Sequence, residues 1–258
     1  MSKVLGVDIG NTSTSAAVME GGRILGFGYH PTAWSSSAQI NIFIRTVVAG
    51  FHLDGSVLCS VVPHCNRKWM LALRRAADAQ PLLVTHRTKL GVSIVYPKPG
   101  TIGADRLANA SAVSERYDGP VIVADFGTAV TFDVITAKKE YIGGVIAPGL
   151  PLMTDYLYEK TSLLPWIELK SGHGCPAIGK STETAMRVGA QVGYRGMVRE
   201  IVRHLTSRLG MRNVTLCATG GFARWALRGI DMEFKFDPYL TLRGLERIWK
   251  MNKKGEEI

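Results

Sequence analysis

The sequence predicts an α/β protein built from two related lobes, each a mixed sheet with flanking helices. The first observation is a repeated hairpin, because residues 4–18 and 121–135 both run from an apolar strand through an Asp-x-Gly turn into a second strand. Each aspartate also lies eighteen residues before a glycine of the following strand: Asp8 before Gly26, and Asp125 before Gly143. The second observation is the alternation of short apolar runs with helix-like spacing, which is typical of sheets covered by helices.

The length and composition fit two lobes of a globular protein. The chain has 258 residues, of which 46% are hydrophobic and 20% are charged, as in ordinary soluble domains. We place the lobes at 1–118 and 119–258, with a hinge near Asp118-Gly119-Pro120. No apolar run approaches the roughly 18 residues that cross a membrane, and residues 1–10 contain no basic segment followed by an apolar core. We therefore expect a cytoplasmic protein without membrane contact.

The cysteines and the net charge narrow the class of function. Cys59, Cys65, Cys175 and Cys217 form no CxxC pair and no zinc-like cluster with histidine, so we interpret them as reduced thiols. The formal net charge is +10. The basic residues are spread in ones and twos, which favours attraction of small anionic molecules over nucleic acid. Nucleic acid remains the minor alternative.

After the first hairpin, the pattern of the first lobe alternates between strand and helix. A Gly/Pro-rich segment, residues 91–102, then opens onto Gly103-Ala104-Asp105-Arg106 and a further helix. A long loop that leads into a helix start is a typical binding element. The elements predicted before this loop are a strand at 23–29, a helix at 36–48, a strand at 56–62, a helix at 66–77 and a strand at 82–84.

The second lobe repeats the plan. Its longest helix is predicted at 182–209, with Ser181 or Thr182 as the N-cap. Gly189, Gly193 and Gly196 fall close to one face of this helix, where another backbone can approach, either inside the fold or from a second subunit. The other elements predicted after the hairpin are a strand at 141–147, a turn at 148–149, a helix at 152–158, a strand at 214–218, and a Gly-Gly turn at 220–221 before a last helix.

The two Asp-x-Gly turns point to phosphate chemistry. A carboxylate beside free backbone N–H groups can hold a cation and an anionic oxygen together. Taken singly, Asp8 and Asp125 would be read as turn formers, but their repetition and common spacing favour a functional role. From residue chemistry alone, a helix cap is the better explanation for both Asp105 and Thr182.

These motifs resemble known families. The segments 8–12, 125–128 and 219–221 resemble the phosphate and adenosine features of the actin-like sugar-kinase superfamily. A larger set resembles type III pantothenate kinase over nearly the whole chain, and this resemblance implies two actin-like (ribonuclease H-like) lobes with the active site in the cleft between them. The set is DIGNT at 8–12, YPKPGTIGADR at 96–106, DFGTAVTFD at 125–133, GGVIAPG at 143–149, IGKSTETAMRVG at 178–189 and DPYLTLRGL at 237–245.

The resemblance implies an enzyme that transfers a phosphoryl group from ATP to pantothenate, the first step of coenzyme A synthesis. It implies Asp105 as the catalytic base, Asp125 as the ligand of a monovalent cation (K⁺ or NH₄⁺), Mg²⁺ with the ATP, and a homodimer. The implied ATP-binding residues are Asp8, Ile9, Gly10, Asn11, Thr12, Ser13, Thr14, Ser15 and Thr128. The implied pantothenate-binding residues are Tyr96, Gly103, Ala104, Asp105 and Arg106, with Thr182 contributed by the partner subunit.

Two alternatives stay open at this point. One is another small-molecule phosphotransferase on the same scaffold, such as a sugar or carboxylate kinase. The other is a regulatory member of the family, similar to accessory transcription factors, in which the excess basic charge serves nucleic acid.

Overall fold

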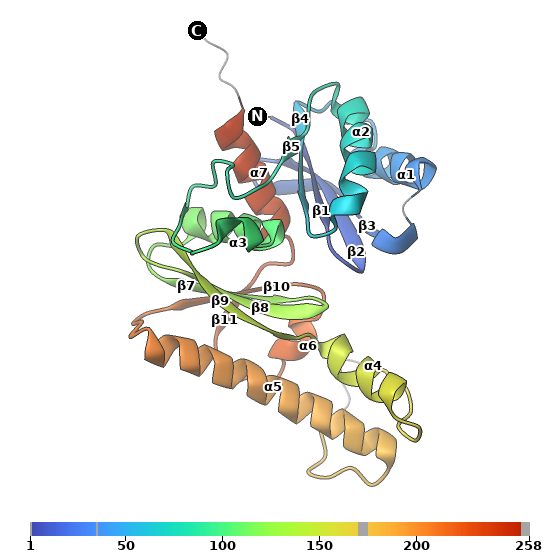
Figure 1. Ribbon diagram of the computed structural model, residues 1–258, viewed down its shortest axis with the longest axis vertical. Helices are drawn as coiled ribbons and strands as arrows, with labels where there is room; N and C mark the ends of the chain where they lie inside the picture. The colour runs from blue at the N-terminus through green and yellow to red at the C-terminus, as the bar shows by residue number, and fades with distance from the viewer. Residues whose placement is uncertain (1, 35, 170–174, 254–258) are drawn as a thin grey trace. The chain divides into compact units, whose positions relative to one another are not determined.

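The structure is a computed structural model, and it describes residues 2–34, 36–169 and 175–253. It divides into two compact units (Figure 1). The first runs from the N-terminus through Asp118, and it also contains Lys139–Ile142 and the segment that begins at Tyr239. The second contains Gly119–Lys138 and Gly143–Pro238. No helix within the described ranges is both long and apolar enough to cross a membrane.

The first unit opens with the first repeated hairpin. Its short strand β6 (Ser93–Ile94) pairs in parallel with the opening residues of β9 (Glu140–Pro148), which belong to the same unit. Its elements are β1 (Val4–Ile9), β2 (Ser13–Glu20), β3 (Arg23–Pro31), η1 (Thr32–Trp34), α1 (Ser37–Val48), β4 (Gly55–Ser60), η2 (Pro63–Cys65), α2 (Asn66–Ala77), β5 (Leu82–Leu83), β6 (Ser93–Ile94), η3 (Pro99–Thr101), α3 (Ala104–Arg116) and α7 (Leu240–Asn252).

The main sheet of the first unit has the strand order β3-β2-β1-β4-β5. It is mixed, because β1 pairs antiparallel with β2 and parallel with β4. Successive side chains of a strand point to opposite faces. Leu5, Val7 and Ile9 of β1 join the core formed with α1 and α2, whereas Gly6 faces Leu245 of α7. Helices α1 and α2 therefore cover one face, and α3 and α7 cover the other.

The second unit is built around the second repeated hairpin, and the strand order through it is β11-β10-β7-β8-β9. This sheet is also mixed, since β7 pairs antiparallel with β8 and parallel with β10. The rings of Phe126 and Tyr194 lie 6.4 Å apart and pack α5 against the sheet. Besides β9, the elements are β7 (Val121–Phe126), β8 (Ala129–Ile135), α4 (Leu150–Lys160), α5 (Thr182–Arg208), β10 (Thr215–Thr219), α6 (Ala223–Leu227) and β11 (Phe234–Phe236).

The two aspartates of the repeat occupy equivalent places in their sheets. Asp8 pairs with Cys59 on the parallel neighbour β4 and with Ser15 on the hairpin partner β2. Asp125 pairs with Thr219 on the parallel neighbour β10 and with Thr131 on the hairpin partner β8. The predicted α/β class with two related mixed sheets is confirmed.

Several details differ from the expected pattern. Helix α4 begins at Leu150 rather than 152 because Gly149 is its N-cap and Pro151 fits its first turn. The strands β6 and β11 were not predicted, since each has only two or three residues. The motif at 237–245 leads into helix α7, which was not predicted and which packs in the first unit.

The glycine face of α5 is open. An added Cβ at Gly189, Gly193 or Gly196 would meet no atom of the described chain within 4 Å. This face therefore does not serve close packing among the described residues.

Candidate active site

The β1–β2 turn carries the residues expected to bind ATP phosphates. Asp8 is half-buried near the end of β1, and Asn11, Thr12 and Ser13 are exposed in and just after the turn. The Gly10 N–H donates to the Ser13 carbonyl oxygen at 3.0 Å and closes the turn. A Cβ atom on Gly10 would lie 2.9 Å from that oxygen, so a side chain there would widen the turn.

Not every residue of the expected ATP-binding segment presents its side chain. Ile9 and Thr14 are fully buried, and Ser15 is half-buried. The Thr14 hydroxyl lies 2.9 Å from the Thr32 hydroxyl. Ile9 and Thr14 therefore support the turn from inside the unit, and only their backbone remains for a ligand.

Asp105 lies in the first turn of α3, whose N-cap is Gly103 rather than Asp105. Its Oδ1 accepts a hydrogen bond from the Arg106 backbone N–H at 2.8 Å. Burial raises the pKa of Asp105 above its ordinary value, while the Arg106 N–H and guanidinium act in the opposite direction. A carboxyl with a raised pKa is a better proton acceptor than an exposed one when it is ionised.

Arg106 and Tyr96 converge on Tyr141. The Arg106 guanidinium lies 5.9 Å from the centre of the Tyr141 ring, and the Tyr96 ring lies edge-on to the same ring at 6.4 Å. Tyr96 is 38% exposed and Tyr141 is buried. The structure thus brings together two residues expected to contact substrate through one that sequence reasoning missed. Only the pairing of β6 with β9, which places Tyr141 opposite Ile94, reveals it.

In the second unit, Asp125 is half-buried near the end of β7 and Thr128 is exposed in the β7–β8 turn. Two glycines support this turn. The Gly149 N–H donates to the Thr128 carbonyl oxygen at 3.1 Å, and a Cβ on Gly149 would overlap that oxygen. Gly220, at φ +94°, lies against the Phe126 backbone with equally little room. Both positions require glycine for close approach.

Thr182 is the first residue of α5 and is exposed. The cap is Ser181, whose Oγ accepts from the Thr184 N–H at 3.2 Å while the Thr184 hydroxyl accepts from the Ser181 N–H at 2.9 Å. This capping box stabilises the helix start without the Thr182 side chain. The capping explanation for Thr182 is therefore wrong.

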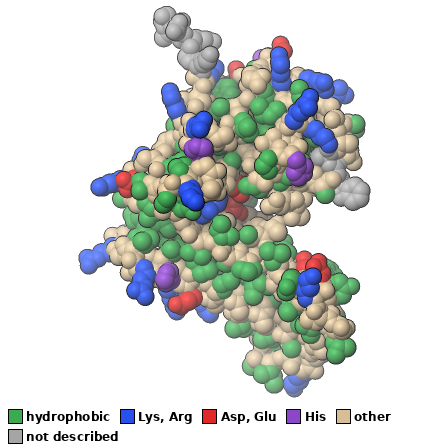
Figure 2. Space-filling view, viewed as in Figure 1, with side chains coloured by type: hydrophobic (Ala, Val, Ile, Leu, Met, Phe, Trp, Pro, Cys, Tyr) green, Lys and Arg blue, Asp and Glu red, His purple; other side chains and the backbone are tan. Residues whose placement is uncertain are grey.

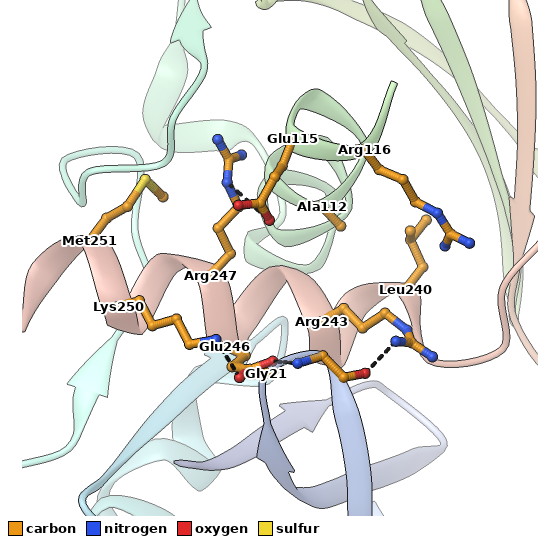
Figure 3. Close-up of a pocket in the computed structure, with 11 residues that line it drawn as sticks. Gly21, Ala112, Glu115, Arg116, Leu240, Arg243, Glu246, Arg247, Lys250 and Met251 are labelled. Atoms are coloured by element: carbon orange, nitrogen blue, oxygen red, sulfur yellow. Dashed lines mark hydrogen bonds and ion pairs between the residues drawn. The ribbon is translucent and has the colours of Figure 1, made fainter. Parts of the chain in front are cut away.

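The first unit also contains a cavity of about 690 Å³ that none of the expected site residues lines. It lies between α3, α7 and the β2–β3 turn (Figure 3). Glu246 accepts from the Gly22 N–H at 2.8 Å and pairs with Lys250 at 2.6 Å, and Arg243 donates to the Gly22 carbonyl oxygen. The contacts of Glu246 and Arg243 with Gly22 therefore link α7 to the β2–β3 turn.

A model of the family described as type III pantothenate kinase matches residues 4–204. The chain belongs to this family. A type III pantothenate kinase from Methylacidiphilum infernorum is 39% identical over 94% of this chain and 86% of its own length. Another from Akkermansia muciniphila is 46% identical over 77% of this chain and 79% of its own length. One from Dehalococcoides mccartyi strain CBDB1 is 37% identical over 97% of both chains.

Solved structures support the fold of this type III pantothenate kinase family member. A Baf family protein from Campylobacter jejuni aligns over 96% of this chain and 98% of its own, with a TM-score of 0.62 and 19% identity. A ROK family glucokinase from Streptomyces griseus aligns over 98% of this chain and 100% of its own, with a TM-score of 0.53 and 12% identity. At these identities the likeness shows the actin-like sugar-kinase fold alone.

The residues present fit a magnesium ion that is held mainly by its nucleotide. Within the described ranges, no three His, Cys, Asp or Glu side chains gather closely enough to hold a metal ion. Mg²⁺ commonly keeps several waters and binds one or two carboxylates together with phosphate oxygens. Asp8, beside the glycine turn, is a donor of the required kind.

Proposed function

We propose that this protein phosphorylates the primary hydroxyl of pantothenate with ATP to give 4'-phosphopantothenate, the first step of coenzyme A synthesis. The observation that carries the proposal is the match of the type III pantothenate kinase family over residues 4–204. The site residues that the resemblance implies all lie within that range, including Asp8, Asp105 and Asp125. The reaction class is phosphoryl transfer to an alcohol.

Asp105 acts as the base in this proposal. Phosphoryl transfer needs alignment of the attacking oxygen and neutralisation of charge more than covalent help from the protein. Asp105 would accept the hydroxyl proton as the new O–P bond forms and the bond to the ADP leaving group breaks. Its fixed position on the Arg106 N–H supports this role, and Tyr96, Gly103, Ala104 and Arg106 would orient pantothenate around it.

ATP is proposed to bind through the residues of the β1–β2 turn. Backbone N–H groups in a glycine-containing turn can cradle phosphate oxygens, and the exposure of Asn11, Thr12 and Ser13 supports such contacts. Bound Mg²⁺ supplies positive charge to the phosphates, and Asp8 would hold it directly or through water. Thr128 is proposed as a further ATP contact.

Asp125 is proposed to bind a monovalent cation, K⁺ or NH₄⁺. Its place in the β7–β8 hairpin repeats that of Asp8 in the β1–β2 hairpin, which supports a parallel role as a cation ligand. The role itself comes from the family motif DFGT at 125–128.

We also propose a homodimer in which Thr182 contacts the substrate bound by the partner subunit. Apolar side chains are exposed on α4 and in the segment before α5: Leu152, Tyr156, Leu157, Tyr158, Leu163, Trp166 and Ile178. Figure 2 shows hydrophobic side chains over this part of the second unit. Exposed apolar patches of this kind mark interaction surfaces. Sedimentation equilibrium tests the proposal, and a fully active monomer at assay concentration contradicts it.

No observation favours the alternatives. Lys and Arg side chains lie in small separate groups on the face shown in Figure 2, and the likeness to the Baf family protein shows the fold alone. A cytoplasmic location also stays a prediction, which cell fractionation tests.

The test of the proposed function is a coupled assay of ADP release with pantothenate, ATP and Mg²⁺. Release that depends on pantothenate, with 4'-phosphopantothenate detected by mass spectrometry, supports the proposal. Turnover with a sugar or another carboxylate and none with pantothenate favours a different acceptor. Salt-sensitive DNA binding without any turnover favours a regulatory role.

A further inference from the structure

Thr32, the first residue of η1 and the residue directly after β3, holds the β1–β2 turn by three hydrogen bonds. Its hydroxyl donates to the Gly10 carbonyl oxygen at 2.8 Å and lies 2.9 Å from the Thr14 hydroxyl. Its backbone N–H donates to the Thr12 carbonyl oxygen at 3.0 Å. Thr32 is 5% exposed, so its own side chain is largely removed from water. One residue outside the ATP-binding segment therefore fixes two carbonyl groups inside it.

Fixing these carbonyls also fixes the direction of the amides that follow them. No peptide bond of the described chain is cis. In a trans peptide the N–H points opposite to the preceding C=O. Because the Gly10 and Thr12 carbonyls point toward Thr32, the N–H groups of Asn11 and Ser13 point away from it. The hydroxyl of Thr32 thus sets the orientation of the Asn11 N–H, and its backbone N–H sets that of the Ser13 N–H.

Cys59 performs a related task for the aspartate of the same turn. Cys59 and Asp8 are direct partners in the parallel pairing of β4 with β1, and the Cys59 thiol donates to Asp8 Oδ1 at 3.1 Å. Cys59 is fully buried. In this contact the thiol is the donor and the carboxylate oxygen of Asp8 is the acceptor.

We propose that Thr32 and Cys59 are positioning residues for the nucleotide: Thr32 pre-orients the turn that receives the phosphates of a nucleoside triphosphate, and Cys59 orients the Asp8 carboxylate toward its metal ion. This inference rests on the proposed role of the β1–β2 turn in ATP binding. Groups fixed before binding lose less conformational entropy when the ligand arrives. Removing either side-chain donor therefore weakens nucleotide binding without removing any group that contacts the nucleotide.

The first test compares Thr32→Val with Thr32→Ser. Valine keeps the branched shape and removes the hydroxyl, whereas serine keeps the hydroxyl. We expect Thr32→Val to raise the KM for ATP, and the Kd for Mg·ATP by calorimetry, by roughly 5- to 20-fold. The KM for pantothenate should stay unchanged, and Thr32→Ser should remain within about twofold of wild type for both ligands. Unchanged ATP constants in the valine variant, or equal losses for ATP and pantothenate, overturn the role of Thr32.

The second test compares Cys59→Ala with Cys59→Ser. Alanine removes the donor and serine retains one. We expect Cys59→Ala to raise the Mg²⁺ concentration that gives half-maximal nucleotide binding by about 3- to 10-fold, since one hydrogen bond to a charged group is lost. Serine should restore it. If alanine and serine give the same Mg²⁺ dependence as wild type, the role of Cys59 is refuted.

Calorimetry of wild-type protein separates these results from failure of the proposed function. If the wild-type protein binds no Mg·ATP, this result contradicts both the inference and the proposed function. If wild type binds Mg·ATP but does not phosphorylate pantothenate, only the acceptor is in error, and weaker binding by Thr32→Val still supports the inference. If wild type phosphorylates pantothenate and all four variants bind Mg·ATP as it does, the inference alone is overturned.

Discussion

Gly244 of α7 packs directly against the backbone carbonyl of Ala108 in α3. A Cβ atom on Gly244 would overlap the Ala108 carbonyl oxygen and crowd the Ala108 Cα. The contact lies in the same unit as the β1–β2 turn and Asp105. It lets α3, which begins just before Asp105, lie close to a helix from the far end of the chain.

Gly244→Ala is expected to lower the free energy of unfolding by about 2 kcal/mol or more, because the two helices must move apart. This loss outweighs the gain in helix propensity of about 1 kcal/mol. Urea unfolding measures it. Gly221→Ala is the control, since a Cβ there would meet no atom of the described residues within 4 Å. Equal stability of the two variants would show that α3 and α7 are not in close contact.

Gly103→Ala is expected to impair catalysis while the protein stays folded. A Cβ on Gly103 would overlap Asp105 Oδ1, which is held by the Arg106 N–H. Displacing the base by a fraction of an ångström to 1 Å should lower kcat by about 10- to 100-fold. Gly100→Ala is the matched control in the same loop, because among the described residues its Cβ would approach only the His86 ring, at an ordinary 3.4 Å. Similar kcat values for both variants would contradict the geometry.

Asp105→Asn should abolish measurable turnover, with kcat lowered by at least about 100-fold, and should stabilise the fold at neutral pH. Burial raises the folded-state pKa of Asp105, so native protein holds a proton that the unfolded chain releases between the ordinary and the raised pKa. Stability therefore falls as pH rises through this window, and asparagine lacks this loss. Urea unfolding at neutral pH and below the ordinary pKa measures it. Measurable turnover by Asp105→Asn would contradict the catalytic part of the prediction. A free energy of unfolding at neutral pH no higher than that of wild type would contradict the stability part.

The pH dependence of kcat should have an acid limb set by Asp105. The base must be ionised, and its pKa is raised by burial. Activity is therefore expected to fall as pH drops through a value above that of an exposed aspartate. The profile should be recorded with ATP and pantothenate both saturating, so that ionisation of free pantothenate does not contribute. An acid limb at the ordinary aspartate pKa would indicate that the base is exposed in the complex.

Asp125→Asn should weaken the dependence of activity on K⁺. A neutral amide oxygen attracts a monovalent cation less than a carboxylate does, so the half-saturating K⁺ concentration should rise by about tenfold or more. Rates are compared in K⁺, NH₄⁺ and Na⁺ at constant ionic strength. An identical K⁺ response in wild type and variant would remove the cation role from Asp125.

The local pattern of the chain was sufficient for most of the elements. Alternating apolar residues and Asp-x-Gly turns located both hairpins, and helix-like spacing located α1, α2 and α5. These signals are local, because a strand or helix repeats over a few residues. Helix α7 was missed because its motif was interpreted only as a family signature.

In the candidate site, too, short sequence motifs located some residues and missed others. The family motifs named Asp8, Asp105 and Asp125 directly, since each belongs to a short conspicuous segment. They did not name Thr32, Cys59 or Tyr141, whose contacts with Gly10, Asp8 and Arg106 join residues that are distant in the chain.

The sequence by itself determined the α/β class, the internal repeat and the family. Periodicity, turn chemistry and the order of motifs can all be detected in short stretches of consecutive residues. Only the tertiary structure decided which side chains support the site. The pairing of β1 with β4 places Cys59 beside Asp8, and the end of β3 returns Thr32 to the Gly10 carbonyl. Such contacts join residues that are distant in the chain, and they exist only after the strands have paired and the core has excluded water.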